Sequence, residues 1–222
     1  MNYQPQVVAI ILARLGSRRF PGKVLTPLAG KPLLLHVVDA ARAASTVDRV
    51  VVATTQLKRD DDLVAVAEEA GVDVFRGSEQ DVLARFAGAI SYSSGEVGVR
   101  LTVDNPLMTG GLIDLVVRRH LASGADYTCN FLQQTLPDGL EVEVIPRHII
   151  EHLLHCATTP DEREHVTWYI RTYKEEFHIE NVAIDTGEVG WEGLSLSIDA
   201  PEDLDRVEIL FEKWKEILAR VA

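Results

Sequence analysis

The chain has 222 residues, of which 46% are hydrophobic and 25% are charged. This is the composition of an ordinary folded domain, and it excludes a disordered or collagen-like protein. The net charge is −12, which argues against nucleic acid as a partner and against an anionic membrane surface. Any anionic ligand is therefore expected to bind at a local site.

The sequence carries no signal for a membrane or for export. No apolar run reaches the roughly 18 residues of a membrane span, and Gln4-Pro5-Gln6 is a poor start for a signal peptide. We therefore expect a cytoplasmic protein with no membrane partner. Cys129 and Cys156 are then expected to be reduced, inert thiols, a disulfide being the alternative.

The first predicted element is a strand over Val7–Leu12, a continuous apolar run that is typical of a strand buried on both faces. The next segment, 13–23, contains two glycines and a proline and is predicted to be a loop. Residues 1–38 include five Lys and Arg but no Asp or Glu. Because ligands of open α/β sheets bind beyond the carboxyl ends of strands, this loop is a candidate polyphosphate site. The alternative is a solvated basic face.

Strand and helix patterns then alternate to about residue 130, which predicts an α/β protein with a mostly parallel central sheet and helices on both faces. The expected helices are Pro32–Ala44, Asp60–Ala70, Glu79–Ile90 and Gly111–Ser123. The expected strands are Asp48–Thr55, Val72–Phe75, Val97–Val103 and Asp126–Asn130.

The second half departs from this rhythm but contains no long linker, so residues 1–222 are expected to form a single domain. After a turn at 137–139, a half-exposed strand is expected over Leu140–Val144. Further helices are expected at Arg147–Cys156, Asp161–Tyr173 and Pro201–Ala219, and further strands at Phe177–Ile184 and Leu194–Ile198.

Several motifs in this order resemble a known family. Residues 13–25 (ARLGSRRFPGKVL) resemble the amino-terminal signature of the sugar-acid cytidylyltransferases, which make CMP-activated 3-deoxy-manno-octulosonate and CMP-sialic acids. Residues 75–83 (FRGSEQDVL), 137–144 (PDGLEVEV) and 163–167 (REHVT) resemble the SpsF-like spore-coat-polysaccharide subgroup more closely. Arg18, Val103 and Trp168 depart from the usual residues of these patterns.

The resemblance implies the Rossmann-like nucleotide-diphospho-sugar transferase fold and a nucleotidyltransferase reaction. An acceptor oxygen attacks the α-phosphorus of CTP, pyrophosphate leaves, and a CMP-linked product of surface polysaccharide or glycan precursor synthesis results. It also implies a nucleotide-binding half at about 1–130 and an acceptor-binding half at about 131–222. The expected partners are CTP and a small-molecule acceptor, and the choice between monomer and homodimer stays open.

Two acidic motifs are expected to hold Mg²⁺ as the cofactor. Asp104-Asn105-Pro106 matches the family's central Asp-x-Pro, and residues 199–204 (DAPEDL) match its carboxy-terminal motif, which begins at Asp199. A hard cation held by one or two carboxylates offsets the charge of a triphosphate. The alternatives are a turn residue for Asp104 and a helix N-cap for Asp199.

Lys23, Arg14 and Asp104 are the candidate catalytic residues. The remaining candidates divide between the two substrates. Those expected to bind the nucleotide are Leu12, Ala13, Arg14, Gly16, Ser17, Arg19, Lys23, Thr55, Arg76, Ser78 and Arg100. Those expected to bind the acceptor are Asn130, Asp138, Glu141, Glu143, Arg163, His165 and Thr167.

Some of these roles have alternatives. Glu141 and Glu143 share a strand face by their spacing of two, so they either recognise hydroxyls and assist the metal or form the solvent face of a hairpin. His165 is a candidate for orienting an anionic acceptor or for general base catalysis.

Three competing functions remain open. The first is a uridylyl- or guanylyltransferase for sugar-1-phosphates, although its usual glycine-rich opening is not present. The second is a transferase acting on a phosphonate or a polyol phosphate. The third is a non-enzymatic nucleotide-binding protein, since function does not follow from fold.

Overall fold

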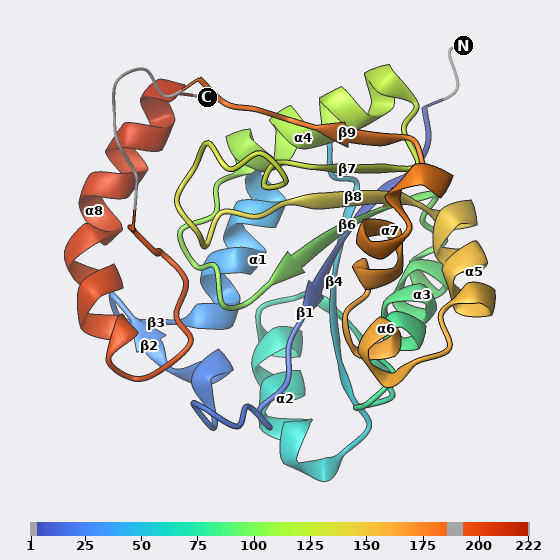
Figure 1. Cartoon of the computed structure of the whole chain (residues 1–222). Coiled ribbons are helices and arrows are strands. Elements are labelled where there is room, and N and C mark those ends of the chain that lie inside the picture. Colours follow the sequence, from blue (N-terminus) through green and yellow to red (C-terminus); the bar gives the residue numbers. More distant parts are fainter. Residues whose placement is uncertain (1–3, 186–192, 222) are drawn as a thin grey trace.

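A computed structural model describes residues 4–185 and 193–221, which contain a seven-stranded sheet between two layers of helices (Figure 1). The strand order is β5-β4-β1-β6-β8-β7-β9, and β8 is antiparallel to both of its neighbours while the other pairs are parallel. The strands are β1 (Val7–Leu12), β4 (Arg49–Thr55), β5 (Asp73–Gly77), β6 (Val97–Thr102), β7 (Tyr127–Cys129), β8 (Glu143–Pro146) and β9 (Ile179–Asn181). The predicted α/β class with a mostly parallel sheet is confirmed.

Two hydrophobic cores lie on opposite faces of the sheet, and the central strand β1 serves both. Val7, Ala9 and Ile11 belong to one core, whereas Val8 and Ile10 belong to the other, as expected for side chains that alternate along a strand. The first core is covered by α1 (Leu33–Ala43), α2 (Asp61–Glu69), α4 (Gly110–Ser123) and α8 (Asp203–Val221). The second is covered by α3 (Val82–Ser93), α5 (Arg147–Cys156) and α7 (Trp168–Thr172), with α6 (Pro160–Glu164) beside α3.

Several short elements were not predicted. A two-stranded hairpin of β2 (Pro27–Leu28) and β3 (Lys31–Pro32) precedes α1. Single 3-10 turns lie at η1 (Lys23–Leu25), η2 (Lys58–Asp60) and η3 (Lys174–Glu176). No helix in the described residues is long and apolar enough to cross a membrane.

The second half corrects several predicted boundaries. The single helix expected over 161–173 is wrong, because α6 and α7 are separated at 165–167, where Val166 and Thr167 turn into the core. The strand expected over Leu140–Val144 begins only at Glu143, and its residues are buried rather than half-exposed. The strand expected over Phe177–Ile184 shortens to β9.

Residues 194–198 do not form the predicted strand. The Leu196 amide donates to the Asp138 carbonyl oxygen at 2.6 Å, and the Ile198 amide donates to that of Asp104 at 2.9 Å. The backbone of Ser195 pairs with that of Asp138 as an isolated bridge and not as part of a strand. The segment is therefore an extended connection that brings Asp199 beside the end of β6.

Candidate active site

The loop after β1 is shaped by a buried carboxylate. Asp60 is fully buried, and its Oδ1 accepts a hydrogen bond from the Leu15 amide at 2.7 Å. Its Oδ2 accepts from the Thr55 hydroxyl. The loop closes on itself through the Gly22 amide, which donates to the Leu15 carbonyl oxygen at 3.1 Å, and Gly22 has a positive φ of 77° that favours glycine.

Lys23 lies at the end of this loop and points inward. Its side chain is buried, with a relative accessibility of 6%, so the alternative of a solvated basic face is wrong for this residue. Its Nζ lies 2.7 Å from Asp104 Oδ1 and 3.8 Å from Asp199 Oδ1, and it donates to the Ile198 carbonyl oxygen at 2.8 Å. One ammonium group therefore joins the first loop, the end of β6 and the segment before α8.

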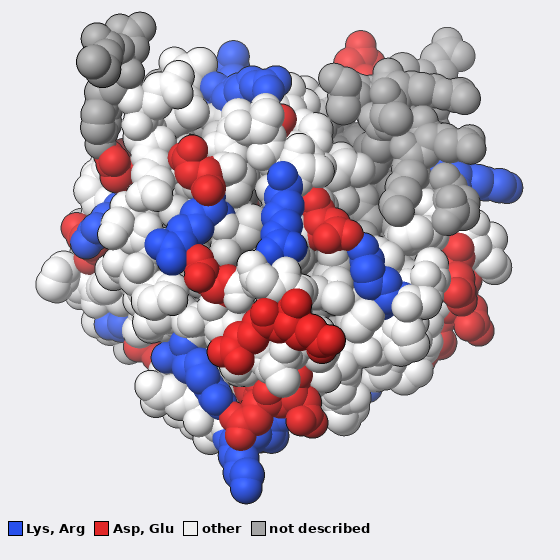
Figure 2. Space-filling view, turned by 180° about the vertical axis from the view of Figure 1, so that it is seen from behind, with Lys and Arg blue, Asp and Glu red and all other residues white. Residues whose placement is uncertain are grey.

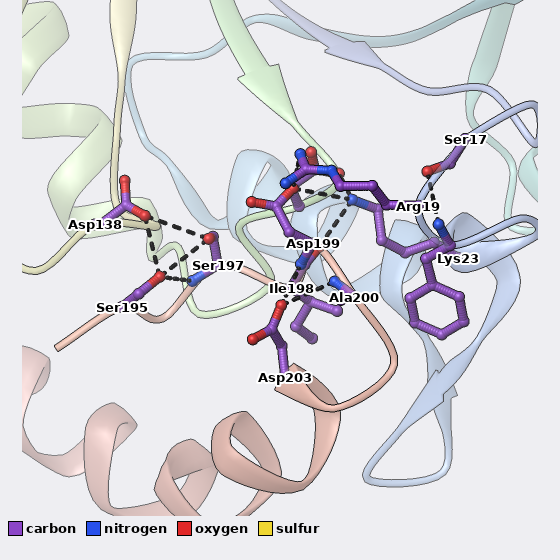
Figure 3. A network of polar contacts seen from close by, with 12 residues as sticks. Ser17, Arg19, Lys23, Asp138, Ser195, Ser197, Ile198, Asp199, Ala200 and Asp203 are labelled. Carbon is purple, nitrogen blue, oxygen red and sulfur yellow. Dashed lines mark hydrogen bonds and ion pairs between the residues drawn. The ribbon is translucent and has the colours of Figure 1, made fainter.

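The Asp199 carboxylate contacts cations and does not cap the N-terminus of α8. Figure 3 shows Arg19 and Lys23 directed toward it, and Arg19 Nη2 lies 2.8 Å from Asp199 Oδ1. The amides of Asp199 and Ala200 both donate to Asp203 Oδ2 at 2.8 Å. Asp203, not Asp199, accepts the backbone hydrogen bonds of this turn.

Asp104 and Asp199 have the chemistry that Mg²⁺ requires. Both carboxylates contact the same ammonium ion, so they converge on the position of one cation. Both are also partly open to solvent, at 41% and 37% of their side-chain surface. The described residues contain no cluster of three or more metal-binding side chains, so a Mg²⁺ ion here would complete its coordination with phosphate oxygens and water.

A pocket of about 250 Å³ opens beside these two aspartates. It contains five of the seven expected acceptor residues together with Arg100. The lining residues are Arg100, Thr102, Asp104, Asn105, Phe131, Asp138, Glu141, Glu143, His165, Val166, Thr167, Arg171, Ser197 and Asp199.

Glu143 forms the buried centre of a polar network. It is 2% exposed and accepts hydrogen bonds from Arg100 Nη1, and at 2.6 Å each from the hydroxyls of Tyr127 and Thr167. Burial by itself would raise the pKa of Glu143, but Arg100 and the two hydroxyls outweigh it and hold that pKa below its usual range. The solvent-face alternative is wrong for this residue, which is an ionised partner that orients Arg100.

Glu141 has the opposite electrostatic behaviour. It accepts hydrogen bonds from Asn105 Nδ2 at 2.7 Å and from the Gly139 amide at 2.9 Å. Burial raises the pKa of Glu141, and the neighbouring Asp138 adds to the shift although the Gly139 amide opposes it. Asp138 in turn accepts a hydrogen bond from the Ser195 hydroxyl at 3.0 Å (Figure 3). Glu141 lies before β8, so it does not share a strand face with Glu143.

Arg14 is held away from the pocket lining. Its Nη1 donates to the Glu79 carbonyl oxygen at 3.3 Å, and its Nη2 lies 3.5 Å from Glu164 Oε1. Arg85, which was not predicted, also donates to the Glu79 carbonyl oxygen and is 3% exposed. Two guanidinium groups therefore meet at one backbone oxygen near the first loop.

The other expected nucleotide residues make structural contacts. Arg76 donates to the carbonyl oxygens of Thr55 and Leu57 and pairs with Asp61. A Cβ at Gly16 would lie 2.7 Å from the Arg59 guanidinium, so glycine permits a close approach there.

Four more of these candidates lie at the strand end or in local turns. Leu12 ends β1, and the Ala13 amide donates to the Ala53 carbonyl oxygen. The hydroxyls of Ser17 and Ser78 accept hydrogen bonds from backbone amides three residues further on.

Two expected acceptor residues are placed outside the pocket. The Asn130 side chain donates to the Leu140 carbonyl oxygen and accepts from the Val142 amide, both at 2.9 Å, so it fixes the segment that carries Glu141. Arg163 donates to backbone carbonyl oxygens at the end of α5 and contacts Asp81 at 3.3 Å. Both side chains therefore bind backbone groups and do not line the pocket.

Six residues that line the pocket were not among the expected site residues: Thr102, Asn105, Phe131, Val166, Arg171 and Ser197. Phe131 directly follows a predicted strand, which was a usable signal for a site residue. Arg171 gave none, because it lies near the end of a segment predicted as one continuous helix.

Comparison with known proteins identifies the family. A family model described as cytidylyltransferase matches residues 8–219. The chain belongs to the cytidylyltransferase family. This cytidylyltransferase is 34% identical to the spore coat polysaccharide biosynthesis protein SpsF of Bacillus subtilis (strain 168), over 95% of this chain and 88% of that protein. It is 31% identical to a 3-deoxy-manno-octulosonate cytidylyltransferase of Anaeromyxobacter sp. (strain K), over 92% and 97% of the two chains.

Solved structures agree with this assignment. A cytidylyltransferase from Leptospira borgpetersenii superposes with a TM-score of 0.90 at 27% identity, covering 98% of this chain and 94% of the other. A CMP:2-keto-3-deoxy-manno-octonic acid synthetase complexed with CTP superposes with a TM-score of 0.69 at 15% identity, covering 94% and 99%, which shows the shared fold alone. The resemblance, the Rossmann-like fold and the nucleotidyltransferase class are confirmed.

Proposed function

We propose that this cytidylyltransferase transfers CMP from CTP to a hydroxyl of a sugar acid, with Mg²⁺ as cofactor and pyrophosphate as the second product. The product would be an activated sugar for surface polysaccharide or glycan synthesis. The observation that carries the proposal is the convergence of Asp104 and Asp199 on Lys23 beside a polar pocket. The relative named as a 3-deoxy-manno-octulosonate cytidylyltransferase supports a sugar acid as the substrate class, and the relative named for spore coat polysaccharide biosynthesis supports the use of the product.

The reaction forms one phosphorus–oxygen bond and breaks another. An acceptor oxygen attacks the α-phosphorus of CTP, pyrophosphate departs with the electrons of its bridging bond, and the acceptor hydroxyl loses its proton. Asp104 and Asp199 would hold the Mg²⁺, which neutralises the triphosphate charge when bound. Lys23, Arg19 and Arg14 supply further positive charge at the same edge of the sheet.

The acceptor would occupy the polar pocket that Asp104 and Asp199 line on one side. Asp138 and Glu141 offer carboxyl oxygens that can accept hydrogen bonds from sugar hydroxyls. His165 also lines the pocket and is the candidate general base for the attacking hydroxyl, because imidazole is the side chain used most often for this task.

A panel assay tests the proposal. The protein is incubated with Mg²⁺, each of the four NTPs, and sugar acids, sugar-1-phosphates, polyol phosphates or phosphonates, and pyrophosphate release is measured. We expect release with CTP and a sugar acid, and loss of release when EDTA removes the metal. Release with a phosphorylated acceptor and none with any sugar acid would contradict the proposed acceptor class.

A further inference from the structure

Arg171 differs from the other cations at the site. It lies on α7 and lines the pocket together with Arg100. Arg100 is paired with the buried Glu143, and Lys23 and Arg19 are paired with Asp104 or Asp199. In the part of the chain that the structure describes, no carboxylate oxygen lies within 4.0 Å of the Arg171 guanidinium.

Aromatic rings hold Arg171 in place of a carboxylate. Its Cζ lies 5.8 Å from the centroid of the Trp168 ring and 6.0 Å from that of Phe131, both within the range of a cation–π contact. Trp168 also contacts His165, with 5.6 Å between the ring centroids and 35° between the ring planes. These contacts position the guanidinium without using its N–H groups as donors to a carboxylate, so those donors stay available to a ligand.

The charges that line the pocket make an unpaired guanidinium important for binding an anionic ligand. Five carboxylates line the pocket, at Asp104, Asp138, Glu141, Glu143 and Asp199. An anionic ligand would be repelled by them wherever no uncompensated cation stands nearby. The charge of Arg100 is already compensated, because Glu143 is ionised and buried against it. Arg171 is therefore the position in this pocket where a negative group of the acceptor gains most.

We propose that Arg171 binds the anionic group of the acceptor, with Phe131 and Trp168 fixing the guanidinium. The guanidinium fork matches a carboxylate or a phosphate equally well, and the acceptor classes in the test distinguish these two. The inference rests on the proposed function, since it assumes that the pocket binds the acceptor. It places a contact to the acceptor on α7, a helix that contains none of the expected site residues.

Kinetics of Arg171→Gln and Arg171→Lys test the proposal, with Arg147→Gln as the matched control. Arg147 pairs with Glu151 on the surface of α5, so its loss removes the same charge away from the pocket. With 3-deoxy-manno-octulosonate as the varied acceptor, we expect Arg171→Gln to raise the acceptor KM at least tenfold and leave the KM for CTP within twofold. Arg171→Lys should recover part of the loss, because it restores the charge without the fork. Thermal unfolding of each variant confirms that the fold is kept.

A neutral acceptor separates charge recognition from packing. The amide of the same sugar acid should react poorly with the wild type, and Arg171→Gln should add little further loss with it. If only sugar phosphates show the tenfold effect, the bound group is a phosphate. An unchanged acceptor KM in Arg171→Gln, with an active wild type, would overturn this inference and leave the proposed function standing. A wild type that releases no pyrophosphate with any acceptor would instead overturn the proposed function.

Discussion

At the scale of single residues, Asp199 and Asp104 are the residues that we propose as ligands of the Mg²⁺ ion. Asp199→Asn and Asp104→Asn keep the side-chain shape but remove the charge, so we expect each to lower pyrophosphate release more than a hundredfold across a Mg²⁺ titration. Asp205→Asn is the matched control for Asp199, because Asp205 is exposed on the first turn of α8. Wild-type turnover in Asp199→Asn would leave Asp104 as the sole protein ligand.

Lys23 contributes to stability as well as to the site. Its side chain is buried and has three oxygen partners. We therefore expect Lys23→Met to lower the free energy of unfolding by about 1.5–3 kcal/mol and to weaken CTP binding. Urea unfolding and CTP titration measure the two effects.

Lys31→Met provides the control for that experiment. Lys31 pairs with Asp39 at a solvent-exposed position, and such pairs contribute about 0–1 kcal/mol. Equal unfolding free energies for Lys23→Met and the wild type would mean that the buried contacts of Lys23 do not stabilise the fold.

At the scale of elements, β8 carries the ionised side chain of Glu143 opposite Arg100 of β6. The pKa of Glu143 is lowered in the folded state, so its stabilising contribution is present above the unfolded pKa and is lost as the pH falls through the folded pKa. Glu143→Gln should therefore flatten the rise of unfolding free energy with pH in the acidic range. It should also lower stability by about 3–5 kcal/mol at neutral pH, because Arg100 loses its buried partner.

Glu141 supplies the comparison within the same segment. Its pKa is raised in the folded state, so the sign of its pH dependence is opposite: its contribution is present below the unfolded pKa and decreases as the pH rises through the folded pKa. Glu141→Gln should consequently leave the acid limb of the pH–stability curve unflattened. A similar flattening in both variants would contradict the assignment of Glu143 as the buried anion.

Local patterns predicted some elements well and others poorly. The apolar runs of β1 and β4 and the capped α4 were predicted almost to the residue, because burial and end signals lie within their own sequence. The break at 165–167 was not, since it depends on Thr167 reaching Glu143 across the fold. The position of Asp104 followed from the end of a predicted strand. The strand predicted before Asp199 does not form, so the position of Asp199 and the burial of Lys23 both depend on contacts of the distant segment 194–199.

At the scale of the whole molecule, the relevant feature is where the positive charges of this acidic chain lie. On the face shown in Figure 2, Lys and Arg side chains are interspersed with Asp and Glu rather than gathered in one broad basic area. In the loop after β1, by contrast, Arg14, Arg19 and Lys23 come from one acid-free stretch of sequence. This arrangement suits a compact polyphosphate better than an extended polyanion.

Nucleotide selectivity should be visible as thermal stabilisation. We expect CTP with Mg²⁺ to raise the melting temperature more than ATP, GTP or UTP at the same concentration, because only a nucleotide that binds the native state well shifts unfolding. The stabilisation is about 2.7 kcal/mol at a hundredfold excess over Kd. Equal shifts for all four nucleotides would show that the site reads the triphosphate and not the base.

The most direct test of CMP transfer is to analyse both products of one reaction. The protein, CTP, Mg²⁺ and the sugar acid that is active in the panel are combined, and the adduct mass and the amount of pyrophosphate are measured together. Attack at the α-phosphorus predicts an acceptor joined to CMP and one pyrophosphate for each adduct formed. Consumption of CTP that yields inorganic phosphate and CDP, or pyrophosphate without any CMP-linked acceptor, would contradict the account.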